Sequence, residues 1–126
     1  MKRTSFNFMS FYDIEVVSAA PGERIKIGSG SDFIMPEMWG QAIKRVNADG
    51  STYFLIIFNS ERAPAFEIIA HECWHMFFLI LEFQQEGELT ATELCKELYA
   101  MCFETLYGRT LKALAELRML KEAMND

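Results

Sequence analysis

The feature that most constrains how this chain folds is an apolar stretch, residues 65–83, that contains no glycine and no proline. It is longer than an ordinary strand and nothing in it breaks a helix, so it predicts a buried helix that runs to about Gln85. Its longest fully uncharged apolar run, Met76–Leu81, is far too short to cross a membrane. Pro64 before the stretch and Gly87 after it suit the two ends of such a helix.

The residues before this stretch have the composition of strands and turns. In one strand, Thr52–Phe58, apolar residues fall on both faces, which predicts that both faces are covered. The complete expectation is one or two strands over 6–17, a strand over 24–27, a flexible loop over 28–32, a helical turn or loop over 35–40, and a β-hairpin of 41–46 with 51–58.

Helical segments are expected after the long helix. One extends from about Ala91 to Tyr107, Gly108 bends or ends it, and another covers Thr110–Ala123. Leucines spread over a broad face of the last segment, which favours packing on the core over a dimer seam. They are Leu111, Leu114, Leu117 and Leu120. The predicted fold class is α+β: one domain over residues 1–126, with a mainly antiparallel N-terminal sheet followed by the long helix and one or two C-terminal helices.

The two histidines of the chain both lie within the long helix, in the string His71-Glu72-Cys73-Trp74-His75. Residues i and i+4 of a helix share a face, so both imidazoles can direct a nitrogen at one Zn²⁺, at about 2.0–2.1 Å. Glu72 lies beside that position and could move a proton between bound water and a leaving amine. The alternative is two core histidines near a carboxylate, but their burial would need the compensation that a metal supplies.

Charge and cysteine content exclude several classes of partner. The net charge is −6 and no basic block stands out, which argues against nucleic acid and anionic membranes. The three cysteines form no C-x-x-C motif, and Met1–Ser5 lacks the apolar core of a signal peptide. We therefore expect a soluble, cytoplasmic protein that is a monomer or a homodimer.

A catalytic zinc ion normally has three protein ligands. No third histidine exists, and Cys73 lies about 200° round the helix from His71, so a carboxylate is expected to complete the site. The next helix offers Glu93, Glu97 and Glu104.

A resemblance to a known family indicates which of these carboxylates is the third ligand. Thr52–Phe58, the string Ile68–His75 and the later Glu97-Leu98-Tyr99-Ala100-Met101 together resemble the minimal gluzincin-type metallopeptidases, particularly small ones carried by phages and prophages. The resemblance covers roughly Gly40–Tyr107. In that family the third ligand is a glutamate that commonly precedes an aromatic-Ala-aromatic stretch. Glu97 is the match, with Met101 in place of the second aromatic, and Glu93 one turn earlier is the competing residue.

The resemblance implies a zincin-like fold and zinc-dependent hydrolysis of peptide bonds. Zn²⁺ would be held by His71, His75 and Glu97, and Glu72 would act as general base and then as general acid. It also implies that a peptide or protein substrate lies extended along an edge strand of the sheet, Thr52–Phe58. The substrate-binding residues expected on that strand are Thr52, Phe54, Ile56 and Phe58.

Further side chains are candidates for supporting roles. A second electrophile at the oxyanion could be Tyr99, Tyr107, Tyr53 or Arg109. Glu67 and Glu82 share the histidine face, so either could accept a hydrogen bond from a ligand N–H.

Two functions remain open because the chain lacks the second subdomain that normally closes the cleft of a zincin. One is an active minimal peptidase with an open groove. The other is a catalytically lapsed zincin-fold binding protein with a structural zinc, for example a phage protein acting on a host partner. The intact Glu72 favours the first, since a purely structural site has no use for that acid. Mn²⁺, Co²⁺ or Ni²⁺ could occupy similar ligands.

Overall fold

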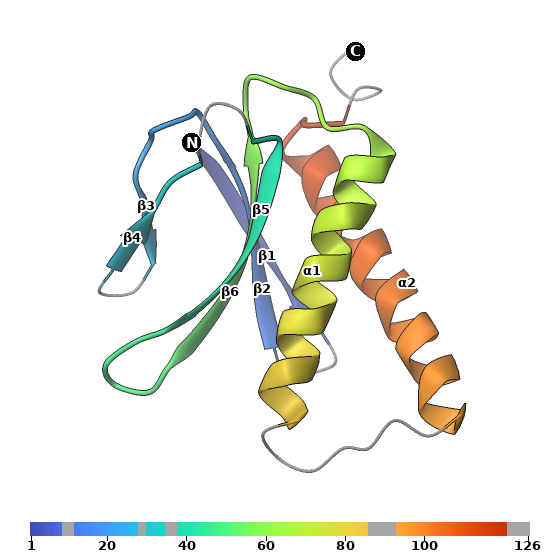
Figure 1. The fold of residues 1–126 in the computed structure, drawn as a ribbon. Helices are drawn as coiled ribbons and strands as arrows, with labels where there is room; N and C mark the ends of the chain where they lie inside the picture. Colours follow the sequence, from blue (N-terminus) through green and yellow to red (C-terminus); the bar gives the residue numbers. More distant parts are fainter. Residues whose placement is uncertain (9–11, 28–29, 35–37, 86–92, 121–126) are drawn as a thin grey trace.

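A computed structural model describes residues 1–8, 12–27, 30–34, 38–85 and 93–120, apart from the side chains of 83–85 and 93–99. Within these residues the chain is α+β, as expected, with strands first and helices last (Figure 1). The elements are β1 (Lys2–Phe8), β2 (Tyr12–Ala19), β3 (Ile25–Ile27), β4 (Gly30–Asp32), β5 (Gly40–Val46), β6 (Thr52–Asn59), α1 (Phe66–Gln85) and α2 (Glu93–Glu116).

The main sheet has the strand order β1-β2-β6-β5. β5 and β6 form the expected antiparallel hairpin, with Gly40 opposite Phe58 and Val46 opposite Thr52. β6 also pairs in parallel with β2, so it is a central strand. The expectation that Thr52–Phe58 is an edge strand is therefore wrong, because β2 pairs with the edge of β6 that β5 does not occupy. The two edges of the sheet are β1 and β5.

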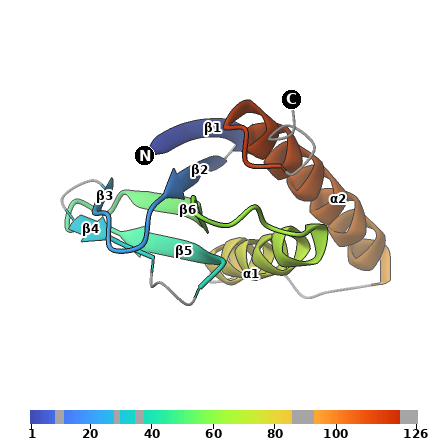
Figure 2. The same ribbon diagram turned by 90° about the horizontal axis from the view of Figure 1, so that it is seen from above.

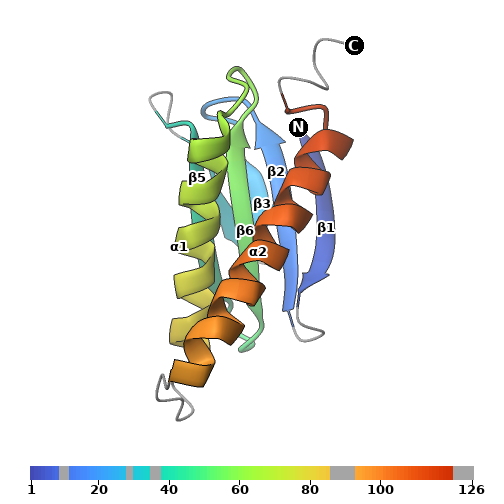
Figure 3. The same ribbon diagram turned by 90° about the vertical axis from the view of Figure 1, so that its right-hand side faces the viewer.

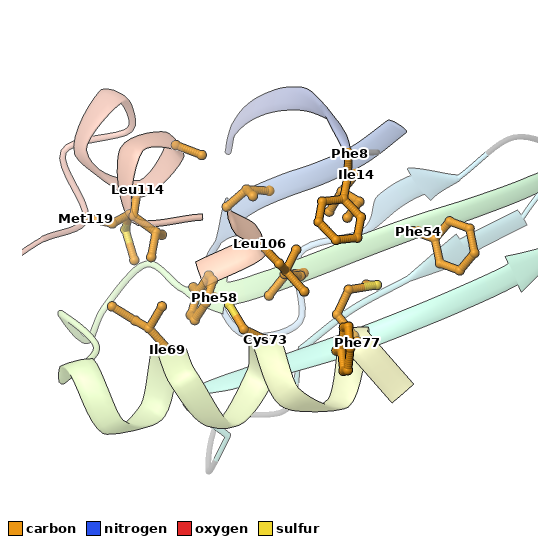
Figure 4. Close-up of a cluster of buried hydrophobic side chains, with 14 of the residues drawn as sticks. Phe8, Ile14, Phe54, Phe58, Ile69, Cys73, Phe77, Leu106, Leu114 and Met119 are labelled. Carbon is orange, nitrogen blue, oxygen red and sulfur yellow. The ribbon is translucent and has the colours of Figure 1, made fainter. Parts of the chain in front are cut away.

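β6 is covered on both faces, which confirms the expectation from its apolar pattern. Phe54, Ile56 and Phe58 pack on the helix side, in a core that α1, α2 and the β1–β2 hairpin complete (Figure 4). Leu55 and Ile57 pack on the opposite face, in a second core that includes buried isoleucines of β3. The two helices thus share one face of the sheet, and β3 and β4 lie beyond the other (Figure 2).

The small β3–β4 ladder corrects the expectation of a flexible loop over 28–32 for residues 30–32, while residues 28 and 29 lie outside the described part of the chain. Gly30–Asp32 forms β4, antiparallel to β3. Arg45 of β5 stabilises this strand: its Nη2 donates to the Ser31 carbonyl at 3.3 Å, and its Nη1 lies 4.0 Å from the Asp32 carboxylate. Burial of Ile25 and Ile27 fixes the partner strand, so a glycine-containing segment becomes ordered by tertiary packing.

α2 is continuous through Gly108, so the helix does not end there, and Thr110–Glu116 belongs to the same helix rather than to a separate one. Leu106 and Thr110 on either side are fully buried, and the Thr110 hydroxyl donates to the Leu106 carbonyl at 2.8 Å. Packing on the core therefore outweighs the low helix propensity of one glycine. Leu114 and Leu117 are buried in that core, as the leucine face predicted.

The helix ends in a turn that satisfies its last carbonyl groups. Arg118 adopts a positive φ of 57°. The N–H of Arg118 donates to Ala115 O at 3.0 Å, and the N–H of Met119 donates to Leu114 O at 2.8 Å. This is the pattern of a Schellman motif, here with arginine in the position that glycine usually occupies.

α1 and α2 lie side by side on the sheet (Figure 3). α1 contacts β5 and β6, whereas α2 crosses over β1 and β2. Neither helix, over its described residues, has the length and apolar character that a membrane span requires. The arrangement places α1 next to the free edge of β5, where the candidate site lies.

Candidate metal centre

The two histidines meet on the exposed face of α1. His71 Nε2 and His75 Nε2 are 2.9 Å apart, and the rings are perpendicular within a few degrees, at 86°. The two histidines share one helix face, as expected. Both side chains are exposed, however, so the expectation that their burial would require a metal is wrong. Their nitrogens converge on one point in front of the helix.

Glu72 is the third member of the cluster and is exposed by only 6 %. Among the described residues its Oε2 has no hydrogen-bond partner. Burial raises the pKa of this carboxyl above its usual value, and the nearby His75 and His71 act in the opposite direction. A buried carboxylate oxygen without a protein partner is costly, so this oxygen suits contact with a cation or a proton donor.

The donor set suits a divalent transition metal. One ligand atom from each of His71, Glu72 and His75 lies within 4.8 Å of the others. Two nitrogens bound to one zinc ion at tetrahedral angles lie about 3.3 Å apart. The observed 2.9 Å differs from this by an amount that small imidazole rotations supply. No other His, Cys, Asp or Glu among the described side chains joins the cluster.

The cluster opens into a groove of about 550 Å³ between α1 and the start of β5. Its α1 wall runs from Ile68 to Glu82, about 21 Å along one helix face at 1.5 Å per residue. The described lining residues are Met38, Trp39, Gly40, Gln41, Ala42, Ile68, His71, Glu72, His75, Phe78, Leu79 and Glu82.

Small residues of β5 make this groove. A Cβ at Gly40 would lie 3.0 Å from Glu72 Cγ and 3.2 Å from the Phe58 ring, so a side chain there would collide. Ala42 follows on the same face of the strand and packs against the helix-side core. The sequence suggested strand β5 but not its place beside the histidines. The alternation of two small residues, Gly40 and Ala42, was the available signal.

The residue expected to be the third ligand falls outside what the structure describes. Glu97 and its competitor Glu93 belong to α2, but their side chains are not among the described ones. Glu104, the remaining candidate, is exposed and does not join the cluster. Cys73 points away as expected: it is fully buried in the helix-side core, and burial raises the pKa of its thiol to about 11 (Figure 4).

The candidates for an oxyanion partner do not line the groove where they are described. Tyr53 lies in another pocket beside Arg3 and Lys26. Tyr107 stacks on Phe103 between the helices, and burial raises its pKa. Arg109 faces β1 with Ser5 and Asn7. The side chain of Tyr99 is outside the described part of the chain.

The strand that was expected to bind the substrate, Thr52–Phe58, is not accessible along its edges. Phe54, Ile56 and Phe58 are buried by 96 % or more, and both edges of their strand are occupied by β2 and β5. Thr52 lies at the far end of β6, opposite Val46. β5, rather than β6, is therefore the edge strand beside the histidines. Of the two acids on the histidine face, Glu82 lines the groove, whereas Glu67 is not among the lining residues.

Comparison of the chain with protein-family models, with curated proteins and with solved structures gave no match. The function is therefore argued from the geometry of the site itself.

Proposed function

We propose that this chain is a zinc-dependent peptidase of the minimal gluzincin type, with a zincin-like arrangement of strand edge and active-site helix. The observation that carries the proposal is the place of the cluster. His71, Glu72 and His75 open together into an elongated groove that runs beside a free strand edge. Paired imidazoles and a buried carboxylate at such a groove suit hydrolysis of an extended peptide.

Each residue of the cluster has a distinct role. His71 and His75 hold the metal through Nε2, and Glu97 is the proposed third ligand, with Glu93 as the competitor. The bound zinc supplies Lewis acidity that lowers the pKa of a water and polarises a carbonyl. Glu72 takes a proton from water at its unpaired Oε2 and delivers it to the leaving amine.

The free edge of β5 offers a place for the substrate backbone. The N–H of Asn59 donates to the Trp39 carbonyl at 3.0 Å. Because alternate residues of an antiparallel strand direct their polar groups to opposite sides, Gly40 and Ala42 direct theirs to the free edge. An extended peptide can pair with them by β-augmentation. The wall of the groove is long enough for about six extended residues at about 3.3 Å each.

The test is metal content together with hydrolysis. Purified wild-type protein should bind one equivalent of zinc, whereas His75→Ala should bind none and show no zinc-dependent rise in melting temperature. Glu97→Ala should lose the metal and Glu93→Ala should keep it, and the reverse result would exchange their roles. Glu72→Gln is the matched control, since it should keep zinc and lower peptide hydrolysis by about 10²-fold or more. Wild-type protein that binds no zinc after reconstitution would refute the proposal.

A further inference from the structure

The charges along the groove are unevenly distributed. Apart from the three residues of the cluster, Glu82 is the one charged residue among the described lining residues. No lysine or arginine is among them. Glu82 lies near the C-terminal end of α1, and its side chain is exposed, so a ligand in the groove can reach the carboxylate.

The distance between the histidines and Glu82 determines how long a substrate side chain must be to reach Glu82. Glu82 follows His75 by seven residues, which is two turns on the same face and about 10.5 Å along the axis. The walls between them include the apolar side chains of Phe78 and Leu79. A lysine or arginine side chain spans about 6–7 Å from Cα to its charge. Together with the reach of the Glu82 side chain, it could therefore pair with this carboxylate from a substrate residue held near the histidines. Shorter side chains could not.

A positive charge lies near the opposite end of the groove, on a residue that is not among the described lining residues. Trp39 lines that end next to Gly40, which adjoins Glu72. The guanidinium of Arg62 lies over the Trp39 ring, with Cζ 5.0 Å from the ring centroid. A cationic substrate group is therefore attracted at the Glu82 end, and Arg62 makes the Trp39 end less favourable for it.

We propose that Glu82 determines specificity by binding a cationic group of the substrate, namely a lysine or arginine side chain whose stem lies on Phe78 and Leu79. This inference rests on the proposed function, because it takes the substrate to be a peptide held at His71 and His75. Among the described lining residues, apolar walls with one charge at the far end suit side chains that bury a hydrocarbon stem and extend a charged head. An N-terminal ammonium group is another source of the same charge.

The experiment measures peptide binding, separately from activity. Fluorescein-labelled peptides, acetylated and amidated, would differ at one position, which carries arginine, lysine, norleucine or glutamate. Binding would be followed by fluorescence anisotropy, using Glu72→Gln protein with zinc and wild-type protein in EDTA. We expect the arginine and lysine peptides to bind about two- to five-fold more tightly than the norleucine peptide, and less so at high salt.

Variants of Glu82 test whether this residue causes the preference for arginine and lysine peptides. Glu82→Gln should remove it, and Glu82→Lys should transfer it to the glutamate peptide. Glu67→Gln is the matched control, because Glu67 is exposed on the same helix but is not among the described lining residues. Equal binding of arginine and norleucine peptides, a preference that survives Glu82→Gln, or no peptide binding at all would each overturn the inference.

Two further comparisons separate the remaining alternatives. A peptide with a free N-terminus and no basic side chain, compared with its acetylated form, shows whether the N-terminal ammonium is the bound group. A basic preference that persists in EDTA, in a protein that neither binds zinc nor cleaves peptides, would refute the proposed function but show that Glu82 binds cationic peptides. Zinc-dependent hydrolysis without a preference for basic peptides would support the proposed function and refute the role of Glu82.

Discussion

Gly40 and Glu72 are in such close contact that a side chain at residue 40 would fit only if Glu72 moved. A Cβ at residue 40 would lie 3.0 Å from Glu72 Cγ, and it would also lie 3.3 Å from the Ile57 carbonyl oxygen. The backbone oxygen cannot move independently of the sheet, so Glu72 would have to yield. The absence of a side chain on β5 thus fixes where the carboxylate of the candidate site stands.

Gly40→Ala should therefore impair function more than folding. We expect a loss of about 1–3 kcal/mol in unfolding free energy from overpacking, with zinc binding retained because neither histidine is displaced directly. Peptide hydrolysis should fall at least tenfold, since a small misplacement of a catalytic group is sufficient for this. Hydrolysis rates, zinc content and urea denaturation would be compared. Unchanged hydrolysis would show that the position of Glu72 does not depend on this contact.

Gly108→Ala is the matched control for Gly40→Ala, and we expect it to stabilise the protein. Nothing lies within 4 Å of a Cβ at this position, which is inside α2. Alanine should raise the unfolding free energy by about 0.5–1 kcal/mol, because glycine loses more backbone entropy in a helix. Urea denaturation at constant m-value measures the change. A destabilised variant would mean that the helix needs flexibility at Gly108.

Proline substitutions should distinguish the two sides of β5. Ala42 directs its N–H to the free edge, so Ala42→Pro should fold but weaken peptide binding. Gln41 directs its N–H toward β6, so Gln41→Pro should cost at least about 1 kcal/mol more in stability through a lost ladder hydrogen bond. Denaturation and peptide anisotropy on both variants check this. Equal peptide affinity for wild type and Ala42→Pro would argue against β-augmentation at this edge.

Cys73 should resist alkylation in the folded protein. It is fully buried and burial raises the pKa of its thiol to about 11, so at pH 8 it is both inaccessible and protonated. Iodoacetamide followed by peptide mass spectrometry should find Cys73 unmodified in buffer and modified in guanidinium. Cys102, which is partly exposed, should be modified sooner. Rapid native labelling of Cys73 would reveal opening between α1 and the sheet.

Local patterns in the sequence predicted local structure well. The span of α1, the β5–β6 hairpin and the shared face of His71 and His75 depend on residues a few positions apart, and all three are present. The covering of both faces of β6 followed from its composition, because an alternating strand would have left one face polar.

The remaining features depend on contacts between distant residues. Thr52–Phe58 could not be recognised as a central strand, since that depends on β2 pairing with it. Gly30–Asp32 becomes a strand through β3 and Arg45, and Gly108 stays helical because residues on both sides of it are buried. The groove residues of β5 were missed for the same reason, since only the packing of α1 shows which strand faces the histidines.

The parallel pairing of β2 with β6 has a consequence for folding kinetics. Ile14 pairs with Phe54, which is forty residues further along the chain, whereas every described residue of the groove comes from the single stretch 38–82. Contacts between distant residues form slowly, because a long loop must close before they contribute. The hairpin and α1 can therefore assemble the groove early, while the N-terminal hairpin joins the sheet later. Core substitutions in β2 should then mainly speed unfolding, whereas those in β6 should also slow folding.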